Sequence, residues 1–270
     1  GVQSAESRFP CWNPVLFRAP NNTVYLYFKV GTSAELWNTW VIKSNDEGKS
    51  WSDPVRLENH SDNSPVGPFK NKVLLLQDGT WLAPNSREQS EAWDAFVDIS
   101  VDGGKTWSQS KYVPIEHSRF NGKGVIQPTL WESQSNHVHM LLRSTNGKVY
   151  KSESTNGGRT WSRLKKTLLP NNDSSFDIVK LTNKKLALVL NPVSNSTDIK
   201  SPLTVILSMD NGETWSHNLN IESEDGDFSN PSIIRVMRAC LVLRLARLTI
   251  RRLVTSAIVS TSTMPLSRRV

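Results

Sequence analysis

The chain has 270 residues, among them ten Trp and only two Cys, and it contains no run of eighteen apolar residues that would predict a membrane span. Two cysteines are too few for a disulfide scaffold or a zinc cluster, and neither a cofactor nor a metal is predicted. The formal charge of +7 resides in residues 236–270, which hold seven Arg and no acid, so a basic patch on the fold and binding of nucleic acid by it are not expected.

The N-terminal sequence GVQSAESRFPCW lacks the basic and apolar regions of a secretory signal. Four N-x-S/T triplets are compatible with a secreted or lumenal protein, but such triplets also arise by chance. The sequence therefore leaves the cellular location open, and the oligomeric state with it.

The segment SVDGGKTWS, from Ser100 to Ser108, has Gly, Lys and Thr in the order of a phosphate-binding loop. Such a loop needs another Gly five residues before its Gly-Lys-Thr, and this chain has Ile99 there. A nucleotide site is therefore excluded.

The same segment belongs to an internal repeat. Related boxes occupy residues 44–51, 100–107, 154–161 and 208–215, at spacings of 56, 54 and 54 residues, a period typical of propellers and solenoids. In each box an Asp or Asn can accept backbone N–H bonds, a Gly permits positive φ, and a Trp can bury its ring against the next unit. Because four copies cannot face one pocket, we expect a structural role for Asp46, Trp51, Asp102, Trp107, Asn156, Trp161, Asp210 and Trp215.

Four short segments rich in β-branched and aromatic residues surround each box, which predicts an all-β propeller with the box between the third and fourth strands of each blade. The predicted strands, in chain order, are 14–19, 23–30, 37–44, 52–58, 71–77, 80–86, 95–100, 110–116, 126–132, 137–144, 148–154, 162–169, 175–181, 186–192, 203–209 and 216–222. A fifth unit begins at 226–235.

Residues 236–270 differ in composition from the predicted propeller, which we place at 1–235. This tail has no Gly, Asp, Asn, Trp, Tyr or Phe, so it lacks both the turn residues and the aromatic strand residues of the earlier units. We favour an out-of-frame or alternatively spliced end that replaces the last blade. An amphipathic Arg/Leu helix over 241–254 is the alternative.

The boxes, in the general form SxDxGxxW, resemble the Asp-box or BNR repeats of sialidases. The segments RFPCWNPVLF, GPFKNKVLLLQDG, GVIQPTLWES, HMLLRS and GDFSNPSII are similar to those of BNR-repeat sialidase-like proteins, over roughly residues 3–235. The resemblance implies a six-bladed propeller of four-stranded antiparallel blades, of which this chain holds about four blades and part of a fifth. It also implies exo-α-sialidase activity on terminal acidic sugars of glycans.

The resemblance also suggests site residues. Sialidases hold the substrate carboxylate with three Arg and use a Tyr nucleophile assisted by a Glu, an exception to the two-carboxylate scheme of most glycosidases. Arg143 is similar to one Arg of this clamp, and Lys200 lies near the position of another. The Glu falls at Gln127 and the Tyr at Asn230, and neither side chain can replace the group expected there.

Further candidates for substrate binding begin or end inner strands: Lys72, Arg87, Asp94, Asp177 and Asn191. Glu88 and Asp94 lie in NSREQSEAWD, the longest polar loop expected between second and third strands, and such loops tend to carry function. His137 and His139 alternate on one strand, but no third metal ligand is evident.

Two classes of function stay open. One is a sialidase-type glycoside hydrolase, with a uronate polysaccharide lyase as a weaker variant. The other is a catalytically inactive propeller that binds a glycan or acidic sugar.

Overall fold

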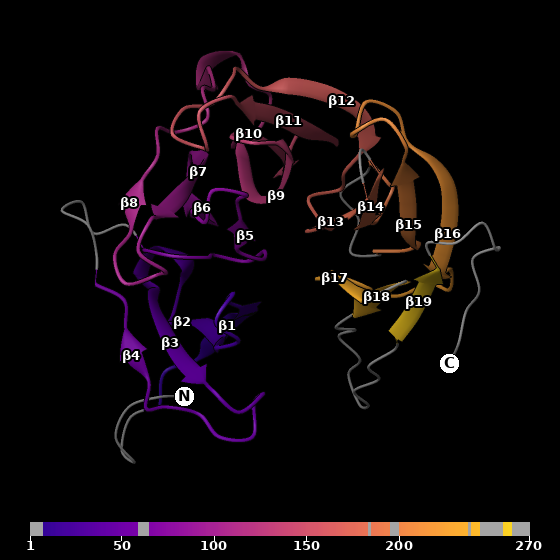
Figure 1. Cartoon of the computed structure of the whole chain (residues 1–270). Helices are drawn as coiled ribbons and strands as arrows, with labels where there is room; N and C mark the ends of the chain where they lie inside the picture. The colour runs from indigo at the N-terminus through magenta and orange to yellow at the C-terminus, as the bar shows by residue number, and fades with distance from the viewer. Residues whose placement is uncertain are drawn as a thin grey trace. The chain divides into compact units, whose positions relative to one another are not determined.

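The computed structural model describes residues 8–58, 65–182, 185–194, 200–236, 239–243 and 256–260. In these ranges the regular structure consists of five β-sheets and two single-turn 3-10 helices, η1(Ala34–Leu36) and η2(His117–Arg119). Figure 1 labels the strands in chain order. The predicted all-β class is confirmed.

In four sheets, four strands are hydrogen-bonded in the order in which the chain forms them. Neighbours joined by short connections run antiparallel, and this order is the topology of a propeller blade, as predicted. The first sheet contains β1(Cys11–Arg18), β2(Val24–Val30), β3(Asn38–Ser44) and β4(Val55–Arg56). The second contains β5(Leu74–Leu75), β6(Trp81–Glu88), β7(Trp93–Ser100) and β8(Ser108–Gln109).

The third and fourth sheets repeat this order. The third contains β9(Val125–Gln134), β10(His137–Ser144), β11(Lys148–Ser154) and β12(Lys165–Pro170). The fourth contains β13(Asp177–Thr182), β14(Lys185–Leu190), β15(Leu203–Ser208) and β16(Ser216–Glu222).

The fourth strand of the second sheet differs from the prediction, because β8 covers Ser108–Gln109 and not 110–116. Ser110 and Val113 still donate their N–H groups to β7, at 2.9 Å each, but their acceptors are only two residues apart. The segment therefore carries an extra residue relative to β7, which interrupts a regular ladder. Pro114 then has no N–H with which to resume it.

The fifth sheet contains β17(Ser232–Val236), β18(Ala239–Leu243) and β19(Ser256–Ser260), paired antiparallel in that order. The helix considered for 241–254 is thus wrong for 241–243, which belong to β18. Residues 244–254 lie outside the described part of the chain. The origin of the tail stays a hypothesis.

Each box forms a hydrogen-bonded turn. In the second box the Ser100 hydroxyl donates to Asp102 and accepts from the Gly104 N–H, both at 2.8 Å. Asp102 also accepts from the Thr106 N–H at 2.9 Å and the Thr106 hydroxyl at 2.6 Å. The first and fourth boxes repeat this pattern around Asp46 and Asp210. The third box repeats it around Asn156, except that Asn156 Nδ2 donates to the Thr160 hydroxyl.

These hydrogen bonds stabilise the ionised carboxylates of three boxes. Bonds from Ser50 and Ser44 lower the pKa of Asp46 to about 2, and bonds from Thr214 and Ser208 lower the pKa of Asp210 to about 2. Bonds from Thr106 hold the pKa of Asp102 well below its usual range. The third box has an uncharged amide, Asn156, in the same geometry.

The box tryptophans contribute unequally to the core. Trp107 and Trp161 are 8% and 7% exposed, whereas Trp51 is 37% exposed. Trp107 packs in an apolar cluster with residues of the first sheet, and Trp161 Nε1 donates to the Ser110 hydroxyl at 3.4 Å. Trp161 therefore contacts the sheet before its own, where the next sheet was expected, and the Trp107 ring packs against Trp81 of its own sheet.

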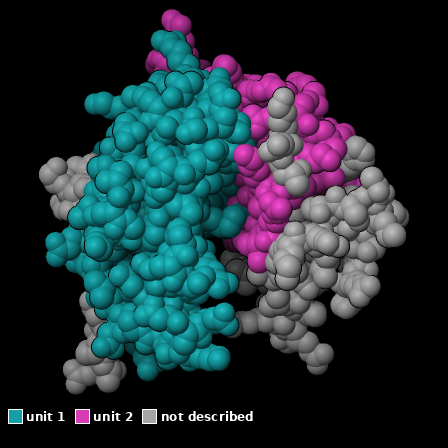
Figure 2. Space-filling view, viewed as in Figure 1, with its two compact units in different colours: residues 1–115, 126–138, 152–163 teal, residues 116–125, 139–151, 164–270 magenta. Residues whose placement is uncertain are grey.

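The chain divides into two compact units, coloured separately in Figure 2. Unit 1 comprises residues 1–115, 126–138 and 152–163, and unit 2 comprises 116–125, 139–151 and 164–270. Alternating strand residues supply the cores. The core of unit 1 includes Val15, Tyr25, Tyr27, Val41, Trp81 and Ala83. The core of unit 2 includes Ala187, Val189, Val205, Ile221 and Ile233.

Three prolines near the start of inner strands follow a residue in the left-handed region. Asn13, Gln127 and Asn230 have φ of 45°, 51° and 54°, and each precedes a Pro. Non-glycine residues seldom adopt this conformation, which costs of order 1–3 kcal/mol. At Asn13 the β1–β2 register also shifts. We call these three positions the left-handed corners.

Candidate functional site

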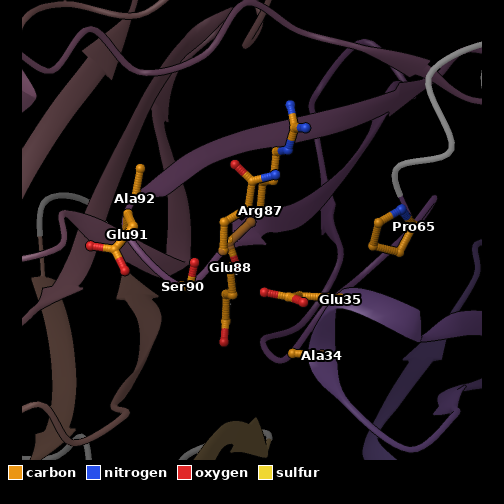
Figure 3. Close-up of a pocket in the computed structure, with 10 residues that line it drawn as sticks. Ala34, Glu35, Pro65, Arg87, Glu88, Ser90, Glu91 and Ala92 are labelled. Carbon is orange, nitrogen blue, oxygen red and sulfur yellow. Dashed lines mark hydrogen bonds between the residues drawn. The ribbon is translucent and has the colours of Figure 1, made fainter.

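Unit 1 contains a pocket of about 470 Å³ at the end of β6 and in the loop that leads to β7. Small-molecule sites commonly have volumes of about this size. In Figure 3, Arg87 and Glu88 extend in opposite directions, as strand neighbours do, and the Glu35 carboxylate points toward Glu88. The pocket thus combines one guanidinium with the carboxylates of Glu35, Glu88 and Glu91.

Arg87 is exposed at this pocket and contacts polar groups of the β6–β7 hairpin. It lies opposite Asp94 in the ladder, although Asp94 is not one of the lining residues. The Gln89 amide, with its oxygen facing the guanidinium, accepts from Arg87 Nε at 3.2 Å and Nη2 at 3.1 Å. A neutral amide orients the guanidinium without neutralising its charge.

Glu88 connects the pocket to the third sheet. Its Oε1 accepts from the Ser86 hydroxyl at 3.2 Å and from Gln127 Nε2 at 3.3 Å. Gln127 is 9% exposed and forms a left-handed corner near the start of β9. At the position where the resemblance implies a Glu, this chain therefore has a Gln whose amide contacts a Glu from another sheet.

A buried lysine lies within electrostatic reach of Glu88. Lys29 is 0% exposed; its Nζ donates to the Thr39 hydroxyl at 2.7 Å and lies 5.1 Å from the centre of the Phe69 ring. Burial lowers the pKa of Lys29 to about 7, although the negative charges of Asp98 and Glu88 raise it. This cation was absent from the sequence-based candidates.

In unit 2, Arg143 ends β10 and is held by a carboxylate. Its Nε donates to Asp173 Oδ1 at 2.8 Å, and the two side chains are 20% and 32% exposed. Asp173 has φ of 61°, a conformation that Asp adopts more readily than most residues. The loop 171–175 therefore fixes the orientation of the guanidinium.

Asn230, the second position at which the resemblance implies a catalytic group, is exposed. Its Oδ1 accepts from the Ser175 hydroxyl at 2.9 Å. An amide and a serine hydroxyl can bind sugar hydroxyls, but the amide cannot act as a nucleophile in place of Tyr.

Two further candidates, Asp177 and Asn191, are buried and form hydrogen bonds with the backbone of other segments. Asp177 is 1% exposed, and its carboxylate accepts from the Ile178 N–H at 2.9 Å and the Ile233 N–H at 3.0 Å, which joins β13 to β17. Asn191 donates to the carbonyls of Lys200 at 2.7 Å and Pro202 at 3.0 Å. A role of these residues in substrate binding stays a prediction.

The structure groups only part of the predicted site residues within a unit. In unit 1, Arg87 and Gln127 both lie next to Glu88, with Asp94 across the ladder, whereas Lys72 is half-buried before β5 and does not line the pocket. In unit 2, Arg143 contacts Asp173, and Lys200 pairs through its backbone with Asp227.

Some residues of these sites carry signals in the sequence. Lys29 has the same strand parity as Tyr25 and Tyr27, which predicts that it faces the core. Asp173 follows two Asn in a polar stretch that reads as a turn. His137 Nε2 lies 3.1 Å from Glu153 Oε2 on the adjacent strand β11. The spacing of the two residues in the sequence gives no sign of this contact.

A family model described as BNR repeat-like domain matches residues 1–241 of this chain. A curated sialidase of Bacteroides fragilis (strain YCH46) is 25% identical over 202 residues, which cover 69% of this chain and 35% of that protein. This chain therefore spans about a third of the length of the curated relative that it matches.

Solved structures show the same fold. A Hadza microbial sialidase, Hz136, has a TM-score of 0.73 at 14% identity, over 88% of this chain and 50% of its own. A Trypanosoma rangeli sialidase in complex with the inhibitor DANA has a TM-score of 0.67 at 13% identity, over 90% and 44%. The sialidase-type propeller fold predicted from the sequence is confirmed. Among the described residues, no helix has the length and apolar character required to cross a membrane.

Proposed function

Because the chain belongs to the BNR repeat-like domain family, we propose that it is a sialidase-type glycoside hydrolase that acts on a terminal acidic sugar of a glycan. The observation that carries the proposal is the contact between Gln127 Nε2 and Glu88 Oε1 at 3.3 Å. It supplies a carboxylate beside the position where the family resemblance implies one, in a pocket that also presents Arg87.

Arg87 and Glu88, which are neighbours on β6, can interact with two different groups of such a substrate. The Arg87 guanidinium can donate two parallel hydrogen bonds to a sugar carboxylate. Glu88 extends the other way and can exchange a proton with a group at the glycosidic bond. In a sialoside the carboxylate and the glycosidic oxygen are bonded to the same anomeric carbon, so both residues engage one sugar only if the exposed Arg87 side chain swings to the side of Glu88.

Glycan binding without hydrolysis is the second candidate. The observation that favours it is the side-chain chemistry of Gln127 and Asn230, since neither amide can act as a base or as the nucleophile. Under this alternative Arg87 and Arg143 would still bind an acidic sugar, and Glu88 would only orient it.

A fluorogenic N-acetylneuraminide assay on folded, monodisperse chain tests the proposal. We expect turnover by the wild type, a loss of about 100-fold or more in kcat for Glu88→Gln, and a raised KM for Arg87→Ala. The matched control is Glu47→Gln, which makes the same change on an exposed turn of unit 1 and should leave turnover unchanged.

The outcomes separate the two candidates. Saturable binding of a sialylated glycan that depends on Arg87, without any turnover, would replace the hydrolase with the binding protein. Turnover that survives Glu88→Gln at the wild-type rate would remove this pocket as the place of reaction. A folded chain that neither binds nor cleaves the sugar would contradict both candidates.

A further inference from the structure

Gln127 has a backbone conformation that its neighbour in the sequence disfavours. Its φ of 51° lies in the left-handed region, whereas Pro128 favours extended backbone at the residue before it. Such a conformation persists only where the surrounding structure fixes it. The contacts of this left-handed corner therefore bear on how the Gln127 side chain is placed.

The side-chain amide of Asn71 forms two hydrogen bonds with this corner. Its Nδ2 donates to the Gln127 carbonyl at 3.0 Å and to the Pro128 carbonyl at 3.1 Å. The two carbonyls belong to consecutive peptide groups, so one amide restricts the backbone on both sides of Pro128. Asn71 is 3% exposed, and a buried acceptor that loses its donor is costly.

The segment that carries Asn71 is anchored to the second sheet. The Gly67 N–H donates to Asp98 Oδ2 at 2.7 Å, and the Phe69 N–H donates to the Pro84 carbonyl at 2.8 Å. Phe69 is also buried, at 1% exposed. A side chain that is fixed by packing and hydrogen bonds in this way can orient the group that it contacts.

The corner in turn determines where the Gln127 side chain points. Gln127 Nε2 donates to Glu88 Oε1 at 3.3 Å, and Glu88 lines the pocket of unit 1. Because backbone conformation and side-chain direction are coupled, a change of φ to negative values would turn the amide away from Glu88. Asn71 is thus connected to the pocket carboxylate through one intervening residue.

A comparable arrangement occurs within unit 2. Asn191 is 1% exposed, and its Nδ2 donates to the Lys200 carbonyl at 2.7 Å and to the Phe228 carbonyl at 3.3 Å. Phe228 lies two residues before the left-handed corner at Asn230. A buried carboxamide that donates to the backbone therefore accompanies both corners at which the family resemblance implies catalytic groups.

We propose that Asn71 is a positioning residue: its buried amide holds the left-handed corner at Gln127, and the corner presents the Gln127 amide to Glu88, whose carboxylate it orients in the pocket. This placement of Glu88 is argued from the contacts alone, but its part in hydrolysis rests on the function proposed above. Asn71 contacts no substrate and acts only through Gln127.

The first test follows Glu88 by NMR in labelled full chain without substrate. A hydrogen bond to the ionised form lowers the pH midpoint of a carboxyl group, so Gln127→Met should raise the midpoint of Glu88 by about half a unit. Asn71→Ala should raise it by a similar amount, because the relaxed corner no longer presents the amide. In the double variant the two effects should not add, since both remove the same contact.

Two controls separate positioning from general destabilisation. Asn45→Ala makes the same change at an exposed position of unit 1 and should not move the Glu88 midpoint. Val41→Ala removes methyl groups from the core of unit 1, so it should lower the urea midpoint of unfolding without moving the Glu88 titration. A wild-type Glu88 midpoint in folded Asn71→Ala overturns the inference, whether or not the chain proves to be a hydrolase.

Two further measurements decide the matter where Asn71→Ala does not fold. In the wild type, the Gln127 side-chain N–H signals should shift with the Glu88 midpoint, because the two groups share a hydrogen bond. Adding Gln127→Gly to Asn71→Ala should restore stability, since Gly adopts positive φ without strain. Gln127 signals that do not respond to Glu88, or a double variant no more stable than Asn71→Ala, would contradict the proposal.

The part in hydrolysis is measured by kcat. Asn71→Ala should lower kcat by about 10-fold through misplacement of Glu88, and it should cost nothing further once Gln127→Met is present. A purely structural role would lower kcat by the same factor in both backgrounds, and that result would remove Asn71 from the reaction. A chain without turnover contradicts the proposed function alone, and the titrations still decide whether Asn71 positions Glu88.

Discussion

Arg143 and Asp173 form a half-buried ion pair, with Nε and Oδ1 separated by 2.8 Å. The pair keeps the guanidinium in one orientation and also offsets part of its charge. An acidic sugar that binds Arg143 must therefore compete with a carboxylate that the fold already supplies. Under the proposed binding of an acidic sugar, Asp173 would therefore lower the affinity of Arg143 for that sugar without contacting it.

We predict that Asp173→Asn strengthens binding of free sialic acid by a few-fold, because the amide can keep the hydrogen bond while the competing charge is removed. Titration calorimetry at fixed salt measures the change. Asp225→Asn removes the same charge from an exposed position of unit 2 and should have little effect. Weaker binding in Asp173→Asn would mean that orientation of Arg143 matters more than its charge.

The boxes predict a sensitivity to acid. Asp102 has its pKa depressed by the fold, so the stability it contributes is present above about pH 3.8 and is lost as the pH falls toward its lower folded value. Asp102→Asn should remove this part of the acid dependence, as the natural Asn156 already does in the third box. Urea unfolding between pH 4 and pH 2 follows the difference.

The reverse change supplies a control for this prediction within the same chain. Asn156→Asp places a carboxylate among the hydrogen-bond donors that Asn156 now faces, so it should create acid dependence where the wild type has none. If both variants unfold with the same pH dependence as the wild type, the box carboxylates do not govern acid stability.

Lys29 predicts a further rise in stability with pH, in the neutral to alkaline range. Its folded pKa of about 7 lies below its ordinary value of 10.5, so the unfolded chain binds more protons between these values and stability rises with pH, by at most about 1.4 kcal/mol per unit. Burial raises the pKa of Tyr27, which should reverse the trend above about pH 10. Lys29→Met should flatten the rise, as measured by urea unfolding, and a rise that persists in this variant must come from another group.

Substitutions at Gly103 and Gly104 of the second box test the effects of backbone strain and steric clash separately. A Cβ on Gly104 would lie 2.7 Å from the buried Trp81 ring, whereas one on Gly103 would find Trp81 only at 4.0 Å. Both have positive φ, but the first and fourth boxes place Glu47 and Asn211 at the position of Gly103.

We predict that Gly104→Ala lowers the free energy of unfolding by about 1–3 kcal/mol, through overpacking and strain. Gly103→Asn should change it by no more than about 0.5 kcal/mol, since Asn tolerates the left-handed region. Denaturant unfolding of the two variants gives the comparison. Equal losses would show that the Trp81 ring can move aside.

The fold was predictable because its signals are local. A box keeps Ser100, Asp102, Gly104 and Thr106 within seven residues, and their hydrogen bonds close on one another, so the sequence spacing alone indicates the turn. The β8 segment departed from prediction because its end is decided by pairing with β7, which no local pattern reveals.

The candidate site was less predictable because its contacts join distant parts of the chain. Glu88 and Gln127 are 39 residues apart, and their meeting depends on how two sheets pack within unit 1. Arg143 could be found by its motif, but Asp173, thirty residues later, has no motif of its own. The alternation of residues in β2 predicts that Lys29 faces the core. It does not predict which acids act on Lys29 electrostatically.

The left-handed corners at Asn13, Gln127 and Asn230 have a consequence for the evolution of this scaffold. The backbone penalty at each corner is carried by whichever non-glycine residue occupies it, so exchanging one such residue for another alters the side chain without adding a new penalty. Two of the three are positions where the family resemblance implies catalytic groups. A lineage can therefore gain or discard reactive chemistry at these corners by single substitutions, while the blades that carry them remain as they are.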